Sequence, residues 1–217
     1  MIDEPARSAS TGKPRVLRRL RYREADPPQL PADVTRFLDD AEERIEAFFE
    51  RKAKVARLGF FPSDYPLVFD TLRRVQKRHD EVRTFCEWGS GFGVVSGLAA
   101  FLGLEATGIE LHPELVVASR RLLADHDLAV EIQEGSFIPE SYVMPAYLLD
   151  PAHVTSFQIV DADGDVDVEI EDFDVVFAYP WPGEEVAYCD IFRRHAARGA
   201  ILVTYNGLEG MRVRRRS

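Results

Sequence analysis

Cysteine is scarce in this 217-residue chain, which contains only Cys86 and Cys189. Neither has a second Cys or His at the spacing of a metal site, so we expect two reduced thiols that pack as small hydrophobic side chains. Long hydrophobic runs are also missing, and the N-terminal region is Arg-rich and interrupted by Pro and Asp, unlike a signal segment. We therefore expect a soluble, cytoplasmic protein with no membrane partner.

Basic residues are few over most of the chain. The net charge is −10, although residues 1–30 carry seven Arg or Lys against four acids and residues 211–217 carry four Arg, so the body between them is near −17. General binding to nucleic-acid phosphates requires a basic face. The acidic body therefore argues against a nucleic-acid partner. The sequence leaves the oligomeric state open.

The first 80 residues lack the alternation of strands and helices. Residues 1–31 mix Ser, Thr, Pro and Arg without apolar periodicity, which predicts a flexible arm. Residues 32–80 predict two amphipathic helices that form a helical lid, the second capped by Ser63 or Asp64 after a Gly-Phe-Phe-Pro break.

From residue 81 onward, short apolar runs alternate with helical patterns, as in βαβ units. The predicted strands span residues 83–87, 105–110, 129–134, 174–178 and 200–204. The predicted helices between them span residues 91–102, 113–126 and 184–197. Residues 81–217 should therefore form an α/β domain, a three-layer αβα sandwich around a Rossmann-like, mainly parallel sheet with the helical segment as an N-terminal extension.

Two features depart from this regular alternation. Residues 156–160 and 166–170 read as a β-hairpin inserted between the third and fourth strands, with an acidic turn at 161–165. The turn has Gly at its fourth position and no closing Glu, unlike a calcium loop, so we expect no metal. Only Met211 to Arg216 remain for a sixth strand, so we expect a shortened sheet.

The most specific motif is a glycine-rich loop where the first predicted strand turns into a helix. It reads Glu-Trp-Gly-Ser-Gly-Phe-Gly over residues 87–93. Glycines at 89, 91 and 93 allow a tight turn and leave backbone N–H groups accessible to a ligand. The next strand ends in Glu110, whose carboxylate can accept hydrogen bonds from both hydroxyls of a ribose. Together these features predict a nucleoside site.

These residues resemble the first two motifs of the class I S-adenosylmethionine-dependent methyltransferases, and the resemblance covers about residues 60–206. It implies S-adenosyl-L-methionine as the cofactor and a small molecule or a protein side chain as the methyl acceptor. The cofactor-binding residues that it implies are Glu87, Gly89, Ser90, Gly91, Gly93, Glu110, Leu111, Ser136 and Phe137.

A narrower resemblance is to the small lysine methyltransferases of the ATP synthase c-subunit type. In those proteins a Pro-containing segment precedes the helix that leads into the glycine loop. Residues 61–65 occupy that place here, and Tyr65 is expected to fold over the cofactor.

The segment after the fourth predicted strand is the candidate acceptor site, because ligands of doubly wound folds bind beyond the carboxyl ends of the strands. It reads Tyr-Pro-Trp-Pro-Gly-Glu-Glu over residues 179–185. Tyr179, Trp181 and Glu184 are the candidate catalytic residues, with Glu185 as a further possible base. Methyl transfer requires mainly alignment and exclusion of water, so whether a base is used stays open.

Two alternatives remain. A nicotinamide-dependent oxidoreductase would use the same fold, but a dinucleotide fingerprint requires its third glycine where Val94 stands. A non-catalytic cofactor-binding or scaffold protein of the same fold is the second alternative, because the segment after the fourth strand matches no known acceptor motif.

Overall fold

The computed structural model describes residues 16–21, 29–51, 60–143, 145, 166 and 168–217. Its strands are β1 (Leu17–Leu20), β2 (Thr84–Trp88), β3 (Glu105–Glu110), β4 (Val130–Glu134), β5 (Val175–Ala178), β6 (Ile201–Tyr205) and β7 (Met211–Arg216). Its helices are α1 (Ala32–Arg51), α2 (Tyr65–Arg78), α3 (Val94–Phe101), α4 (Pro113–Asp125) and α5 (Glu185–His195), with short 3-10 helices η3 (Ile170–Asp172) and η4 (Gly207–Glu209).

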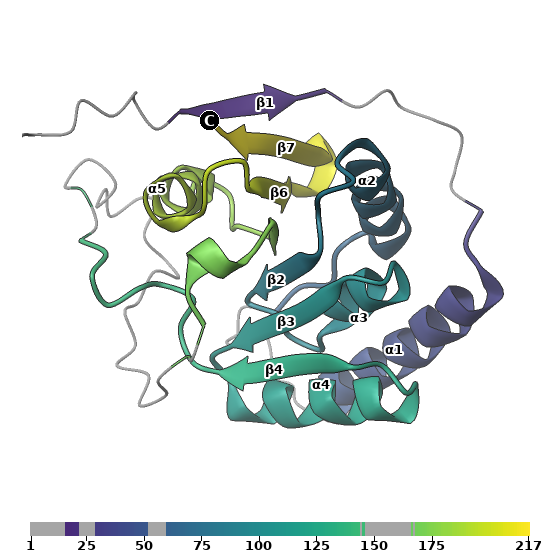
Figure 1. Cartoon of the computed structure of the whole chain (residues 1–217). Helices are drawn as coiled ribbons and strands as arrows, with labels where there is room; N and C mark the ends of the chain where they lie inside the picture. Colours follow the sequence, from purple (N-terminus) through teal and green to yellow (C-terminus); the bar gives the residue numbers. More distant parts are fainter. Residues whose placement is uncertain (1–15, 22–28, 52–59, 144, 146–165, 167) are drawn as a thin grey trace, which may run out of the picture.

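The seven strands form one sheet in the order β1-β7-β6-β5-β2-β3-β4 (Figure 1). Strands β2 to β6 are parallel, and β7 is antiparallel to both β6 and β1. The strand order reverses between β2 and β5: β3 and β4 lie on one side of β2, and β5 and β6 lie on the other. The carboxyl ends of the parallel strands therefore meet at one edge, where such folds bind their ligands.

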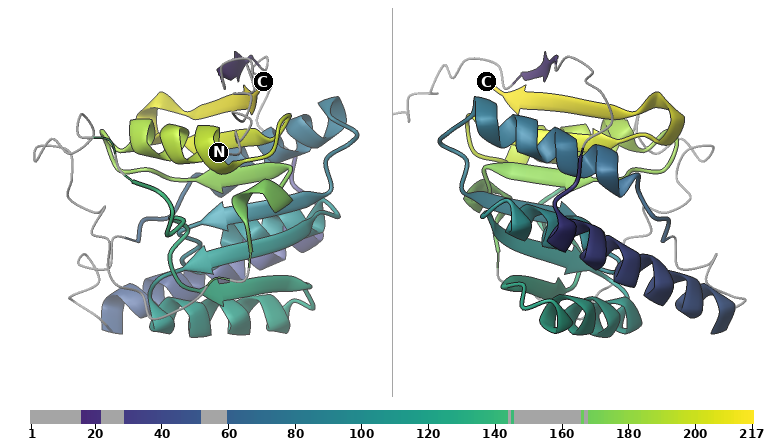
Figure 2. Two further views of the ribbon diagram at one scale, coloured as in Figure 1. Left: turned by 60° about the vertical axis from the view of Figure 1, so that its left-hand side comes forward. Right: turned by 90° about the vertical axis from the view of Figure 1, so that its right-hand side faces the viewer.

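Helices cover both faces of the sheet, as the two views of Figure 2 show. One face is packed by apolar residues of α2 and α3, such as Leu72 and Val95, against Phe85 and Phe177. On the opposite face, Ile191 and Phe192 of α5 pack against alternate residues of the same strands. The expected three-layer αβα arrangement with a Rossmann-like, mainly parallel sheet is confirmed.

Helix α1 adds to the face that carries α3 and α4. Its Phe37 is fully buried, and the Asp40 carboxylate lies 2.8 Å from Nε2 of His126, the residue that ends α4. Arg44 donates a hydrogen bond to Asp125 at 2.8 Å. These contacts hold helix α1 along the outer side of the fold. The division of the chain into a helical lid (residues 32–80) and an α/β domain (residues 81–217) stays a prediction.

The structure corrects two sequence-based expectations. The sheet is not shortened, because Met211–Arg216 forms β7 and Leu17–Leu20, within the expected flexible arm, adds β1 beside it. Leu17 and Leu20 pack toward opposite faces of the sheet, which anchors this strand. The hairpin predicted over 156–170 lies mostly outside the described residues, but Val168 and Glu169 are not in a strand and Ile170 begins η3.

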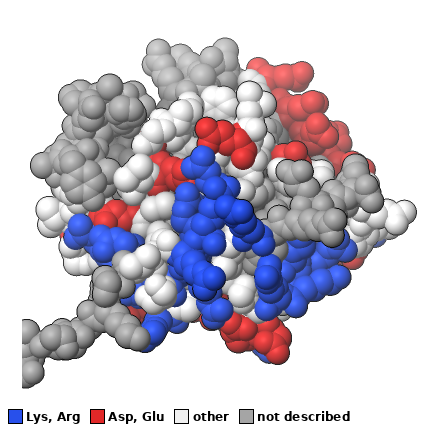
Figure 3. All heavy atoms as spheres, turned by 90° about the horizontal axis from the view of Figure 1, so that it is seen from above, with Lys and Arg blue, Asp and Glu red and all other residues white. Residues whose placement is uncertain are grey.

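Arginines gather along the edge of the sheet formed by β1 and β7. The two strands contribute six of them, and Lys and Arg form a continuous area on the face seen in Figure 3. Among the described residues, no helix is long and apolar enough to cross a membrane.

Candidate functional site

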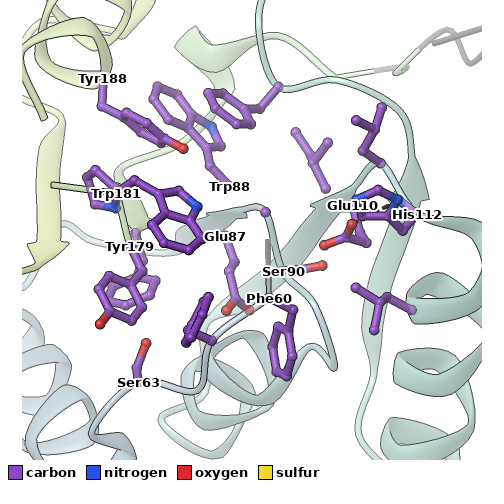
Figure 4. A pocket seen from close by; sticks show the side chains of 18 of the residues that line it. Phe60, Ser63, Glu87, Trp88, Ser90, Glu110, His112, Tyr179, Trp181 and Tyr188 are labelled. Atoms are coloured by element: carbon purple, nitrogen blue, oxygen red, sulfur yellow. Dashed lines mark hydrogen bonds between the residues drawn. The ribbon is translucent and has the colours of Figure 1, made fainter. Parts of the chain in front are cut away.

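A cavity of about 430 Å³ lies at the carboxyl ends of the parallel strands. Figure 4 shows Glu110 and His112 at one end of it and Tyr179 and Trp181 at the other, with Glu87 and Trp88 between them. Of the thirteen residues predicted for the site, all except Gly91 and Gly93 line this cavity. Residues separated by more than 100 positions in the sequence thus converge on one site.

The glycine loop between β2 and α3 forms the floor of the cavity. Gly89, Gly91 and Gly93 have φ values of +69°, +54° and +67°, in the left-handed region that favours glycine. At Gly89 an added Cβ would meet nothing within 4 Å, so this position leaves room for a ligand.

The other two glycines serve packing, which differs from the expectation that all three admit a ligand. A Cβ at Gly91 would clash with the ring of Phe60, and one at Gly93 would crowd Leu123 and Ser119. Phe60 itself lines the cavity, so Gly91 allows the segment before α2 to close over the loop.

Glu110 connects the loop to the neighbouring strand. Its carboxylate accepts hydrogen bonds from the backbone N–H of Gly91 at 2.7 Å and from that of His112 at 2.8 Å. The residue is 5% exposed and lies at the carboxyl end of β3. Each carboxylate oxygen can accept more than one hydrogen bond, so the group retains the capacity to bind hydroxyls of a ligand.

Glu87 holds the start of α3. One of its carboxylate oxygens accepts hydrogen bonds from the backbone N–H of Ser96 at 2.8 Å and from the Ser96 hydroxyl at 2.7 Å. Burial raises the pKa of Glu87 to about 8, the hydrogen bonds from Ser96 oppose this shift, and the nearby Glu110 charge adds to it. Glu87 is therefore largely protonated near neutral pH, and a positive group beside it would favour its ionised form.

Two buried polar atoms in the cavity have no hydrogen-bond partner among the described residues. They are the indole Nε1 of Trp88, a residue 2% exposed, and the hydroxyl of Ser90, a residue 3% exposed. An unsatisfied buried donor costs about 1–3 kcal/mol, so such groups generally have a partner in the functional state. Both residues line the cavity, so a ligand bound there is the expected source of the missing partners.

Aromatic rings line the wall above the loop. Trp88 stacks on Phe137 with ring centroids 4.9 Å apart and an interplanar angle of 9°, and Tyr188 of α5 lies 5.1 Å from Phe137. Burial raises the pKa of the Tyr188 phenol far above its usual range, and the carboxylates of Glu184 and Glu110 raise it further. Tyr188 is therefore a neutral hydroxyl at physiological pH.

The end of the cavity predicted to hold the nucleoside contains Leu111 and Ser136 next to Glu110 and Phe137. Ser136 accepts a hydrogen bond from the backbone N–H of Ile138 at 3.1 Å, which fixes the turn after β4. The predicted adenine-side residues are thus brought together at the ends of β3 and β4.

The end of the cavity predicted to hold the methyl acceptor is formed by the segment after β5 and the segment before α2. Phe61 contacts Trp181 edge to face at 4.8 Å, and Tyr179 contacts Tyr205 at 4.7 Å. Tyr65 is half-buried at the start of α2, and burial of its hydroxyl raises its pKa well above the usual value. Asp64, not Ser63, caps α2 through its hydrogen bond from the Leu67 N–H at 3.0 Å.

Glu184 and Glu185 have different environments. Glu184 is 3% exposed, lines the cavity and accepts a hydrogen bond from the Trp181 N–H at 3.3 Å. Glu185 points elsewhere: it forms ion pairs with Arg212 and Arg214 of β7 and accepts a hydrogen bond from Thr204. Of the two acids, Glu184 is the one that lines the cavity.

No protein-family model and no curated protein sequence matches this chain. Among solved structures, an RNA methyltransferase from Salinibacter ruber in complex with S-adenosyl-L-homocysteine is 20% identical, with a TM-score of 0.49 over 72% of this chain and 93% of that one. A methyltransferase from Geobacter sulfurreducens is 18% identical, with a TM-score of 0.49 over 88% of this chain and 92% of that one.

The strand order, with an antiparallel β7 beside five parallel strands, defines a Rossmann-like methyltransferase fold. The narrower resemblance to lysine methyltransferases of the ATP synthase c-subunit type finds no support in these comparisons.

Proposed function

We propose that this protein is an S-adenosyl-L-methionine-dependent methyltransferase that acts on a small molecule or a protein side chain. The observation that carries the proposal is the Glu110 carboxylate, which is hydrogen-bonded to the glycine loop at the floor of a cavity that is also lined by Trp88 and Ser90, each with an unsatisfied polar atom. This combination of a ribose acceptor and a glycine loop suits a nucleoside ligand.

The cavity residues fit the cofactor part by part. Glu110 would bind the ribose hydroxyls, while Leu111, Ser136 and Phe137 would flank the adenine. Gly89, Ser90 and Glu87 would face the methionine part, whose ammonium would lower the raised pKa of Glu87 and favour its ionised form. Tyr65 would close this end from α2. Gly91 and Gly93 would act through the shape of the loop, because neither lines the cavity.

When bound, the cofactor supplies a methyl group on a sulfonium, which reacts by direct displacement. The protein must then align the acceptor and exclude water. Trp181 and Phe61 contact each other at the acceptor end, where a bound acceptor would displace water from their rings. Tyr179 and Glu184 would orient the acceptor through its polar hydrogen atoms.

Isothermal titration calorimetry with S-adenosylhomocysteine and with NADH tests the proposal. We expect the first ligand to bind with a dissociation constant in the micromolar range, on the order of −8 kcal/mol, and NADH not to bind. Binding of NADH alone would favour the oxidoreductase alternative. Binding of S-adenosylhomocysteine without methylation of any acceptor in cell extracts would favour the non-catalytic alternative.

A further inference from the structure

Acidic side chains outnumber basic ones among the described residues that line the cavity. Three carboxylates line it, those of Glu87, Glu110 and Glu184, and each residue is no more than 5% exposed. No Lys or Arg is among the described residues that line the cavity, and His112 is the only basic side chain there. The arginines of β1 and β7 lie instead on the edge of the sheet shown in Figure 3.

Acids in the cavity and arginines on the sheet edge favour some ligands of the cavity over others. A buried carboxylate requires a positive or hydrogen-bond-donating partner, and a second anion beside it would be repelled. A phosphate or carboxylate on the acceptor would meet no Lys or Arg among the described residues that line the cavity. The same environment suits an ammonium, which is attracted both to carboxylates and to the faces of aromatic rings.

The acceptor end combines both of these features. Tyr179, Trp181 and Tyr188 line it together with Phe61, and the buried Glu184 stands at the start of α5. Tyr188 follows Glu184 by four residues, so both side chains lie on the same side of this helix. Figure 4 shows Tyr188, Trp181 and Tyr179 along the same side of the cavity, opposite Glu110.

Unsatisfied polar groups in the same cavity show that the acids are not merely a solvated cluster. The Trp88 Nε1 and the Ser90 hydroxyl, both buried, have no partner among the described residues and line this space. The cavity is therefore built to receive a ligand with polar atoms of its own.

We propose that the methyl acceptor is an amine, which enters as an ammonium between the aromatic rings and the Glu184 carboxylate. This inference rests on the proposed methyltransferase function and specifies its acceptor. An acceptor with a phosphate or a carboxylate next to the reacting atom should bind more weakly, because that anion would lie close to the Glu184 carboxylate.

The methyl donor in this transfer is S-adenosyl-L-methionine. The ammonium transfers one proton to Glu184, which frees the nitrogen lone pair. The nitrogen then forms a bond to the methyl carbon while the bond between that carbon and sulfur breaks, and the bonding electron pair stays on sulfur as the neutral thioether. The proton on Glu184 passes to water when the methylated ammonium leaves.

A matched series of three compounds tests the inference on the full chain saturated with S-adenosylhomocysteine. The probes are 2-phenylethylamine, 2-phenylethanol and 3-phenylpropanoate, which share a ring and a two-carbon link and differ in the terminal group. Calorimetry should give at least about tenfold tighter binding of the amine than of the carboxylate. Glu184→Gln should weaken amine binding about tenfold and leave binding of the alcohol and of S-adenosylhomocysteine unchanged.

The control variant is Glu105→Gln, which changes an exposed acid at the opposite end of β3 and should leave all affinities unchanged. With S-adenosyl-L-methionine in place of its product, mass spectrometry should locate the new methyl group on nitrogen. Equal binding of the three compounds, binding by none of them, or methylation at oxygen would overturn the amine assignment. Failure of S-adenosylhomocysteine itself to bind would instead overturn the proposed function.

Discussion

The carboxylate of Glu110 and the backbone N–H of Gly91 are joined by a 2.7 Å hydrogen bond across 19 positions of sequence. This bond ties the end of β3 to the glycine loop after β2, two parallel neighbours in the sheet. Glu110 therefore has two roles: it shapes the loop and it presents a carboxylate to the cavity. A change at this position should affect both folding and ligand binding.

Replacing Glu110 by Ala should lower both stability and cofactor affinity. The N–H groups of Gly91 and His112 lose their acceptor, which costs about 1–3 kcal/mol of unfolding free energy. Loss of the ribose contact should weaken S-adenosylhomocysteine about 10- to 100-fold. Thermal melting and calorimetry measure the two effects, and Glu105→Ala serves as the control on the same strand. Unchanged affinity would exclude Glu110 from the ribose site.

Replacing Gly91 by Ala should cost more than replacing Gly103 by Ala. Both glycines have positive φ, +54° and +77°, so each alanine carries a backbone penalty of about 1–2 kcal/mol. Only at Gly91 would the new Cβ lie against the Phe60 ring, whereas Gly103 has nothing within 4 Å. We expect an additional loss of about 1–3 kcal/mol at Gly91 in denaturant melts.

A double-mutant cycle isolates the contact with Phe60. In a Phe60→Ala background, Gly91→Ala should cost no more than Gly103→Ala does in the unmodified protein. Equal losses for the two glycine variants in the unmodified protein would contradict the close approach of Phe60 to the loop.

The buried Glu87 should make stability depend on pH. Its pKa rises from 4.5 in the unfolded chain to about 8 in the folded protein, chiefly through burial. The folded state therefore binds the proton more tightly, and the stability that the protonated group contributes is lost as pH rises from about 5 to 8. Relative to Glu87→Gln, the unmodified protein should lose on the order of a few kcal/mol over this range in urea melts. Parallel pH curves for the two proteins would contradict the raised pKa.

Glu185→Ala should destabilise the protein and leave cofactor binding intact. Its carboxylate pairs with Arg212 and Arg214 and accepts a hydrogen bond from Thr204 at 3.1 Å, away from the cavity. We expect a loss of about 1–3 kcal/mol in thermal melting. The dissociation constant of S-adenosylhomocysteine should stay within about twofold, because the two sites share no partners. A large loss of affinity would mean that Glu185 acts in the site.

The parallel part of the fold was predictable because each strand there is a short apolar run followed by a helical pattern. Strand β3 has the predicted bounds, and the other four parallel strands differ from theirs by a single residue at their ends. Strand β1 was not predictable: Leu17–Leu20 has only two apolar residues, and they pack on opposite faces of the sheet. Its partner β7 lies at the other end of the chain, so no local pattern connects the two strands.

The site residues were predictable where a sequence motif fixes the backbone. They were less predictable where side chains from distant segments meet only in the folded protein. Glu87, Gly89 and Glu110 follow from the strand ends. Trp88 was not predicted to line the cavity. It follows Glu87 in β2, so the two side chains lie on opposite faces of the sheet, and both reach the cavity because the strand ends there. Phe60 was missed because its place over Gly91 depends on how the segment before α2 returns to the loop.

A crystal structure of the protein with bound S-adenosylhomocysteine tests the central claim most directly. We predict that the ribose hydroxyls lie within hydrogen-bond distance of the Glu110 carboxylate, and that the sulfur faces the space between Tyr179 and Glu184. A ligand bound away from Glu110, or a sulfur turned away from that space, would contradict the assignment of this cavity as a methyltransferase site.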